Sequence, residues 1–152
     1  MKIICVGKIK EKFYKDAVCE YLKRISKYCK LEIIEISDES LEVLAPLKEG
    51  EKILSKIKDN DYVITLEIDG NSLNSLELAK KIDCNFNSNK NLVFVVGGSY
   101  GLSDDVKKRS DYKLSFSSFT FPHQLFRIIL LEQIYRSFKI NHNENYHKWI
   151  NL

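Results

Sequence analysis

Residues 91–140 decide the fold of this chain, and they read NLVFVVGGSYGL (91–102), SDDVKKRSDY (103–112), KLSFSSFTFPHQ (113–124) and LFRIILLEQIYRSFKI (125–140). The first piece is an apolar run that ends at paired glycines, a pattern typical of a buried strand that stops at a ligand-accommodating turn. Because glycine has no Cβ and tolerates a positive φ, we expect a bend at Gly97 and Gly98 and similar freedom at Gly101.

Hydroxyl side chains and aromatic rings are interleaved further along this stretch. They are Ser115, Ser117, Ser118 and Thr120 among Phe116, Phe119 and Phe121, and the segment stops at Pro122. Main-chain donors and acceptors inside an apolar wall suit a small molecule with a flat ring. We therefore expect these two segments to hold one ligand in a neutral slot lined by backbone.

Length and composition limit the class of protein. A chain of 152 residues that is 44% hydrophobic and 30% charged predicts one globular domain over 1–152 and excludes disordered and collagen-like chains. The apolar run after Met1 is too short for a signal peptide or a membrane span, so we expect a cytoplasmic protein. A formal charge of +3 permits a polyanionic partner without requiring one.

The four cysteines are Cys5, Cys19, Cys29 and Cys84. They form no CxxC pair and no framework spacing, which predicts reduced, packed thiols and argues against a zinc site.

Hydrophobic periodicity predicts alternating strands and helices along the rest of the chain. The expected strands are 2–6, 31–36 and 61–68, and the expected helices are 11–29, 51–58 and one that starts at Asn74 and runs past Ile82. Asn74 and Glu77 have the spacing of a capping box. Residues 37–50 are expected to be a loose connection, and Asp69 and Gly70 to close the third strand. This alternation indicates a parallel sheet covered on both faces.

The last predicted helix starts around Pro122, and its apolar residues lie on more than one side. One side can meet the sheet, and we expect the other to meet a second copy of the chain in a homodimer. Glu132 and Arg136 are spaced for an i,i+4 pair.

Lys8, Lys10, Lys12 and Lys15 cluster where the first helix begins. Cations there oppose the helix dipole, so helix stability does not explain them. Two interpretations stay open, a solvated face and a contact with RNA phosphates.

Several nucleotide and hydrolase motifs are missing. GGSYG has Ser99 where a GxGxxG turn has glycine, which disfavours a dinucleotide site, and the chain has no P-loop and no GxSxG.

The order of these parts resembles the small RlmH-type methyltransferases of the SPOUT superfamily. The resemblance rests on VGKIKEKFY (6–14), VITLEIDG (63–70), FVVGGSYGL (94–102), SFTFPHQLFRIILLEQIYR (118–136) and YHK (146–148). It implies an α/β-knot fold, in which a parallel sheet flanked by helices carries a C-terminal deep trefoil knot.

The resemblance also implies an activity. It is the transfer of a methyl group from S-adenosyl-L-methionine to N3 of pseudouridine 1915 in helix 69 of 23S ribosomal RNA. The enzyme would be a homodimer acting on the assembled 70S ribosome, without a metal ion. A binding module that kept the pocket without turnover and a nucleotide-binding oxidoreductase remain as alternatives.

The cofactor residues implied by the resemblance coincide with those chosen from the residue pattern. Together they are Leu66, Gly97, Gly98, Gly101, Phe116, Ser117, Ser118, Phe119, Thr120 and Phe121. The phenylalanines can also be ordinary core residues, with their main-chain groups serving as the contacts.

The reaction needs a group that removes the N3 proton or stabilises the anion that results. The candidates are His147, Tyr146, Arg127 and His123, with Arg136 as a further cation. His123 can instead be a helix-start residue that bonds the main chain. The family pattern is not matched in 37–50, in the asparagines before YHK, or in the four residues 149–152.

Overall fold

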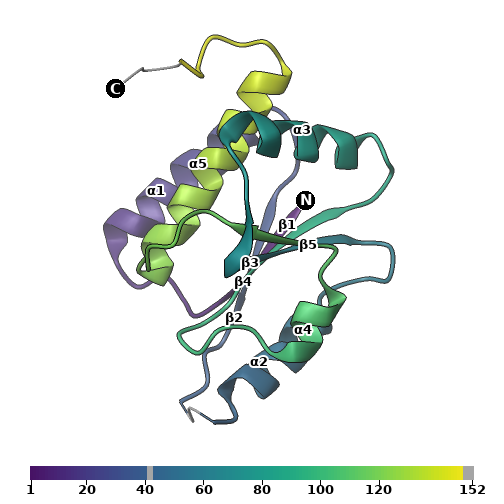
Figure 1. Ribbon diagram of the computed structural model, residues 1–152. Helices are drawn as coiled ribbons and strands as arrows, with labels where there is room; N and C mark the ends of the chain where they lie inside the picture. Colours follow the sequence, from purple (N-terminus) through teal and green to yellow (C-terminus); the bar gives the residue numbers. More distant parts are fainter. Residues whose placement is uncertain (41–42, 149–152) are drawn as a thin grey trace.

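The computed structural model describes residues 1–40 and 43–148, and these form a five-stranded parallel sheet between two layers of helices (Figure 1). The elements are β1 (Lys2–Val6), α1 (Lys12–Ile25), β2 (Glu32–Ile36), α2 (Ala45–Leu54), β3 (Tyr62–Ser72), α3 (Ser75–Phe86), β4 (Leu92–Val96), α4 (Asp104–Arg109), β5 (Tyr112–Ser115) and α5 (His123–Asn141). The predicted α/β class is confirmed. Residues 149–152 lie outside the described residues.

The strands are arranged in the order β2-β1-β4-β3-β5, and every neighbouring pair is parallel. All five residues of β4 are buried, as expected for a central strand whose two faces are both covered. Parallel strands end at the same edge of a sheet, so the segments that follow β1, β3, β4 and β5 meet there. The trefoil knot implied by the resemblance stays a prediction.

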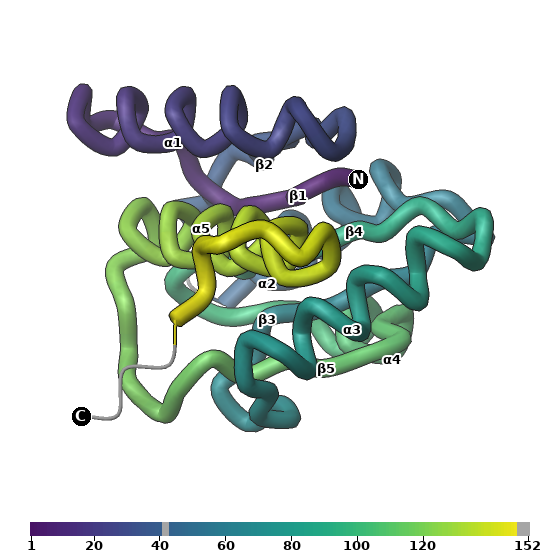
Figure 2. The backbone as a smooth tube through the Cα atoms, turned by 90° about the horizontal axis from the view of Figure 1, so that it is seen from above, coloured from purple at the N-terminus to yellow at the C-terminus, as the bar shows by residue number. Residues whose placement is uncertain are grey.

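Two apolar cores fill the spaces between the layers. Helices α1, α3 and α5 cover one face of the sheet, and α2 and α4 cover the other. Figure 2 shows α5 lying between α1 and α3, and α5 packs against both. The predicted reason for a homodimer is therefore wrong in part, because α5 finds partners for most of its apolar surface within its own chain. Leu125 and Ile129 on α5 stay half-exposed.

The expected loose connection at 37–50 is wrong over its second half, because α2 begins at Ala45 and ends at Leu54. Pro46 lies in the first turn of α2, where a missing N–H costs no helical bond. Position 50, inside α2, is a glycine because α4 packs closely against the helix there. A Cβ on Gly50 would lie 2.2 Å from Ser103 Oγ, the side chain that caps α4.

Strand β3 does not stop before Asp69, as the turn-like Asp69 and Gly70 suggested, but continues to Ser72. Leu66 and Asn71 both pair with Leu114 of β5, so residues 67–70 form an irregular excursion within the strand. Gly70 faces the backbone of β5, since a Cβ there would lie 2.7 Å from the carbonyl carbon of Leu114.

Two further expectations concern the α3 N-terminus and the cysteines. The capping box is confirmed: Asn74 Oδ1 accepts from Glu77 N (2.9 Å), and Asn74 N donates to Glu77 Oε2 (2.8 Å). The four thiols are free, but the expectation that all are packed is wrong for Cys19 and Cys84, which are exposed. Both lie on the outer faces of helices, where periodicity leaves one side to solvent.

Gly50→Ala should lower the free energy of unfolding. Helix propensity alone would favour alanine by about 1 kcal/mol, but overpacking a filled space costs about 1–3 kcal/mol. Urea unfolding measures the difference, with Lys48→Ala on the exposed side of α2 as the matched control. A Gly50→Ala protein that is more stable than the wild type would contradict the close packing of α2 against α4.

At neutral pH, alkylation should be fast at the exposed cysteines and slow at the buried one. Burial raises the pKa of Cys5 to about 11, so its reactive thiolate is scarce as well as inaccessible. We expect maleimide to modify Cys19 and Cys84 in the folded protein and Cys5 only after unfolding, as mass spectrometry of the digested protein would show. Equal rates for Cys5 and Cys19 would refute this.

Candidate functional site

A cavity of about 340 Å³ opens at the carboxyl ends of β3, β4 and β5. We call it the first cavity. Its lining comes from the excursion of β3 (Leu66, Glu67, Ile68, Asp69), from the turn after β4 (Val96, Gly97, Gly98, Ser99, Gly101, Leu102), from Lys107, from β5 and the segment after it (Leu114, Phe116, Ser117, Phe119, Thr120, Phe121), and from α5 (His123, Phe126). The two segments that the sequence singled out therefore line one cavity.

The turn after β4 uses its glycines for two different reasons. Gly101 has the left-handed φ of +79°, and its N–H donates to the carbonyl of Gly98 (3.1 Å). Of the three glycines for which the sequence allowed a positive φ, Gly101 adopts one, and Gly97 and Gly98 do not. At Gly98 the reason is space, because a Cβ would lie 2.9 Å from Val6 Cγ1 and 3.1 Å from Glu49 Oε2.

The segment after β5 forms the opposite wall. Phe116 and Phe121 pack on the ring of Phe126, with ring centroids 5.2 and 5.8 Å apart, so these two rings join the core of α5. Phe119 is 77% exposed, and its N–H donates to Ser117 Oγ (3.0 Å). Ser118 is the one cofactor candidate that does not line the cavity.

The expectation of a neutral slot is wrong, because Glu67, Asp69 and Lys107 also line the first cavity. Thr65 Oγ1 donates to Glu67 Oε1 (2.6 Å), which holds that carboxylate near the end of the strand. These charges were missed because Asp69 and Gly70 suggested a turn. The available signal was that LEID follows a buried parallel strand, whose carboxyl end is where ligands bind.

His123 is the first residue of α5 and lines the first cavity. Its Nε2 lies 3.4 Å from the hydroxyl oxygen of Ser99, a side chain in the glycine turn.

Arg127 lies one turn further along α5 and is almost fully buried. Its guanidinium donates to Glu35 Oε2 (2.9 Å) and to the carbonyls of Val6 (2.9 Å) and Gly7 (2.6 Å). Arg127 lines a neighbouring cavity and not the first one.

Tyr146 and His147 lie near the other end of α5. Tyr146 OH donates to Glu132 Oε1 (3.3 Å), and His147 Nδ1 lies 3.4 Å from Arg136 Nη1, while Arg136 is also paired with Glu132 as predicted. Burial and, second, the Glu132 carboxylate raise the pKa of Tyr146, so it is a neutral phenol that can donate a hydrogen bond.

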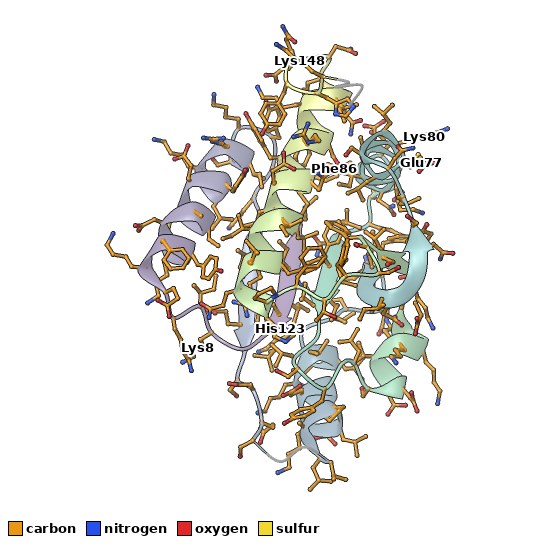
Figure 3. All side chains as sticks on the ribbon, turned by 60° about the vertical axis from the view of Figure 1, so that its left-hand side comes forward. Lys8, Glu77, Lys80, Phe86, His123 and Lys148 are labelled. Atoms are coloured by element: carbon orange, nitrogen blue, oxygen red, sulfur yellow. The ribbon has the colours of Figure 1, made fainter. Side chains whose placement is uncertain are left out.

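Distance separates this tail from the first cavity within one chain. His123 and Arg136 are thirteen positions apart on α5, which corresponds to about 20 Å of helix. Figure 3 likewise shows Lys148 at the top end of the molecule and His123 well below it, near the middle. The structure therefore brings His123 to the cavity and leaves Tyr146 and His147 remote from it.

Neither a metal site nor a membrane-spanning helix is found among residues 1–40 and 43–148. No group of three or more His, Cys, Asp and Glu side chains is placed to hold a metal ion. No helix there is both long and apolar enough to cross a membrane.

Comparison with known proteins agrees with this geometry. A family model described as a predicted SPOUT methyltransferase matches residues 1–147. A protein of Clostridium botulinum (strain Alaska E43 / Type E3) called ribosomal RNA large subunit methyltransferase H is 56% identical, over 96% of this chain and 98% of its own length. A protein of the same name from Clostridioides difficile (strain 630) is 55% identical, over 97% and 99%. The chain therefore belongs to the SPOUT methyltransferase family.

Proposed function

We propose that this protein transfers a methyl group from S-adenosyl-L-methionine to large-subunit ribosomal RNA, at N3 of the helix 69 pseudouridine, within the assembled ribosome. The observation that carries this is the first cavity, which the glycine turn and the Ser/Phe segment build at the carboxyl ends of three parallel strands. Relatives of this chain that are named ribosomal RNA large subunit methyltransferase H align with almost its whole length.

The residues of the first cavity fit S-adenosylmethionine. The ligand has a flat adenine ring, two ribose hydroxyls, a sulfonium, and an amino-acid end with an ammonium and a carboxylate group, so it is positive overall. Phe116 and Phe121 supply an apolar wall for the ring, and the exposed main chain of the glycine turn can bond its edge. Glu67 and Asp69 supply carboxylates for hydroxyls and cations, which suits a ligand with positive groups better than a neutral slot would.

The chemistry asks mainly for positioning, since the bound cofactor supplies its own leaving group. Holding the nucleobase in line with the methyl group can contribute about 7–11 kcal/mol through proximity. The ring nitrogen must also lose its proton. His123 is the imidazole in the wall of the first cavity, and Ser99 can orient it through the hydroxyl at 3.4 Å.

A homodimer would bring the tail to the reaction. Tyr146 and His147 are remote from the first cavity of their own chain, so they can act there only if a second copy presents them. The half-exposed Leu125 and Ile129 on the outer side of α5 offer an apolar surface for that copy. The proton acceptor is then His123 from one subunit or His147 from the other.

Thr120→Trp tests the cofactor site. Thr120 is exposed and lines the first cavity, so an indole there would occupy the space of the ligand. We expect calorimetry to show binding of S-adenosylmethionine weakened about 5- to 150-fold, which corresponds to a steric cost of about 1–3 kcal/mol. The matched control is Lys113→Trp, an exposed residue of β5 outside the cavity. Unchanged affinity in Thr120→Trp, or binding of NAD in place of S-adenosylmethionine, would contradict the assignment.

His147→Ala tests the methyl-transfer activity and which subunit supplies the tail to each cavity. Wild-type protein should transfer labelled methyl groups from S-adenosylmethionine to intact ribosomes, and His147→Ala should lose this transfer while still binding the cofactor. Mixing His147→Ala with Thr120→Trp subunits should restore transfer, because the mixed dimer pairs an intact cavity with an intact tail.

Two results would count against these assignments. Wild-type protein that leaves ribosomes unlabelled would refute the proposed activity. Mixed dimers that form but stay inactive would refute donation of the tail between subunits.

A further inference from the structure

A second cavity of about 260 Å³ lies beside the first, at the carboxyl ends of β1 and β2. It is lined by Val6, Gly7, Lys8, Lys10, Ser37, Asp38, Gly98, Ser99, His123, Gln124 and Arg127. Gly98, Ser99 and His123 line both cavities. A ligand that occupies both would therefore pass over the glycine turn and the start of α5.

The buried Arg127 lines the second cavity, and one of its donors has no partner among the described residues. Its side chain is only 2% exposed, and Glu35, Val6 and Gly7 accept from its two Nη atoms. Its Nε is buried and has no hydrogen-bond partner among the described residues. A buried donor without a partner costs free energy, which a ligand would recover if one of its acceptor atoms reached Nε.

The start of α5 adds further donors. α5 has 19 residues, its N-cap is Pro122 with no capping side chain, and its first turn carries no acidic residue. The first amides of a helix lack intrahelical acceptors and lie at the positive end of the helix dipole. His123 and Gln124, which line the second cavity, belong to this turn.

Lys8 and Lys10 are held at the edge of the second cavity by a rigid loop. Ile9 N donates to Glu35 Oε2 (2.9 Å), and Lys10 N donates to Gln124 Oε1 (2.8 Å). Neither lysine has an ion pair among the described residues, and Lys8 and His123 lie at a similar height near the middle of the molecule in Figure 3.

The chemistry of this lining favours an anion with several acceptor oxygens. Arg127 is already paired with Glu35, but Lys8 and Lys10 still outnumber the single carboxylate of the lining, Asp38, which is exposed. Guanidinium, ammonium and backbone N–H groups are all donors, and together they match a phosphate, which only accepts.

We propose that the second cavity binds a backbone phosphate of the ribosomal RNA beside the target nucleotide. This rests on the proposed function, because the target base must reach the methyl group in the first cavity while its own strand continues past His123. Phosphate contacts set the register of a nucleic acid on a protein, and here they would place one base at the methyl donor. The phosphate interpretation of the lysine cluster thus applies to Lys8 and Lys10.

The test compares two double variants of the full-length dimer. Lys8→Ala/Lys10→Ala removes the two cations from the cavity, and Lys15→Ala/Lys23→Ala removes two exposed cations from α1 without touching it. Both lower the net charge equally. Steady-state methyl transfer to intact ribosomes is measured across a range of salt concentrations, together with calorimetric binding of S-adenosylmethionine.

We expect the Lys8/Lys10 variant to raise the ribosome KM about tenfold and to reduce the slope of log affinity against log salt by about 1. Cofactor affinity should stay unchanged, and the Lys15/Lys23 variant should resemble the wild type. Equal effects in the two variants would mean that the ribosome is attracted by the overall positive charge of the protein. That result would refute a specific phosphate site in the second cavity. Weaker cofactor binding in the Lys8/Lys10 variant would assign the second cavity to the cofactor and also overturn it.

The two proposals fail in different ways. If wild-type protein labels ribosomes but the Lys8/Lys10 variant matches it, the phosphate site alone is refuted. If wild-type protein labels no ribosomes, the proposed function is refuted and the phosphate site with it.

Discussion

The buried guanidinium of Arg127 is the constraint on which the functional end of this protein depends. Burying a charge is costly unless it is paired, and here the two Nη atoms of Arg127 donate to the carbonyls of Val6 and Gly7 at the end of β1 and to the Glu35 carboxylate of β2. These bonds fix the first turns of α5 against the carboxyl edge of the sheet. Glu35 then also holds the loop that follows β1 through Ile9 N. One side chain thereby positions the helix start, the lysine loop and the space between them.

The carboxyl edge of the parallel sheet explains why segments far apart in the sequence meet. β3, β4 and β5 all end there, so the excursion at 67–70, the glycine turn and the Ser/Phe segment surround the first cavity. β1 and β2 end at the same edge, and their following loops make the second cavity. His123 lies between the two because α5 begins where both meet. Binding of a methyl donor and of an RNA strand can thus be adjacent but separate.

Helix α5 also determines what one chain can do alone. It begins at the cavities, runs between α1 and α3, and ends where Tyr146 and His147 fold back on Glu132 and Arg136. A straight helix of this length keeps its two ends apart, so a site that needs both ends needs two copies. Tyr146 and His147 are held by Glu132 and Arg136 of α5, which gives them a defined position at that end of the chain.

The sequence by itself determined the α/β class, the parallel sheet, the Asn74 capping box and the segments that line the first cavity, since local periodicity and glycine placement report these directly. It misplaced the start of α2 and the end of β3, because Gly50 and Gly70 looked like breakers although each is a glycine only to admit a neighbouring element. Only the tertiary structure decided that Arg127 is internal and that the tail lies remote from the first cavity. Such facts depend on contacts between residues distant in sequence, which no local pattern encodes.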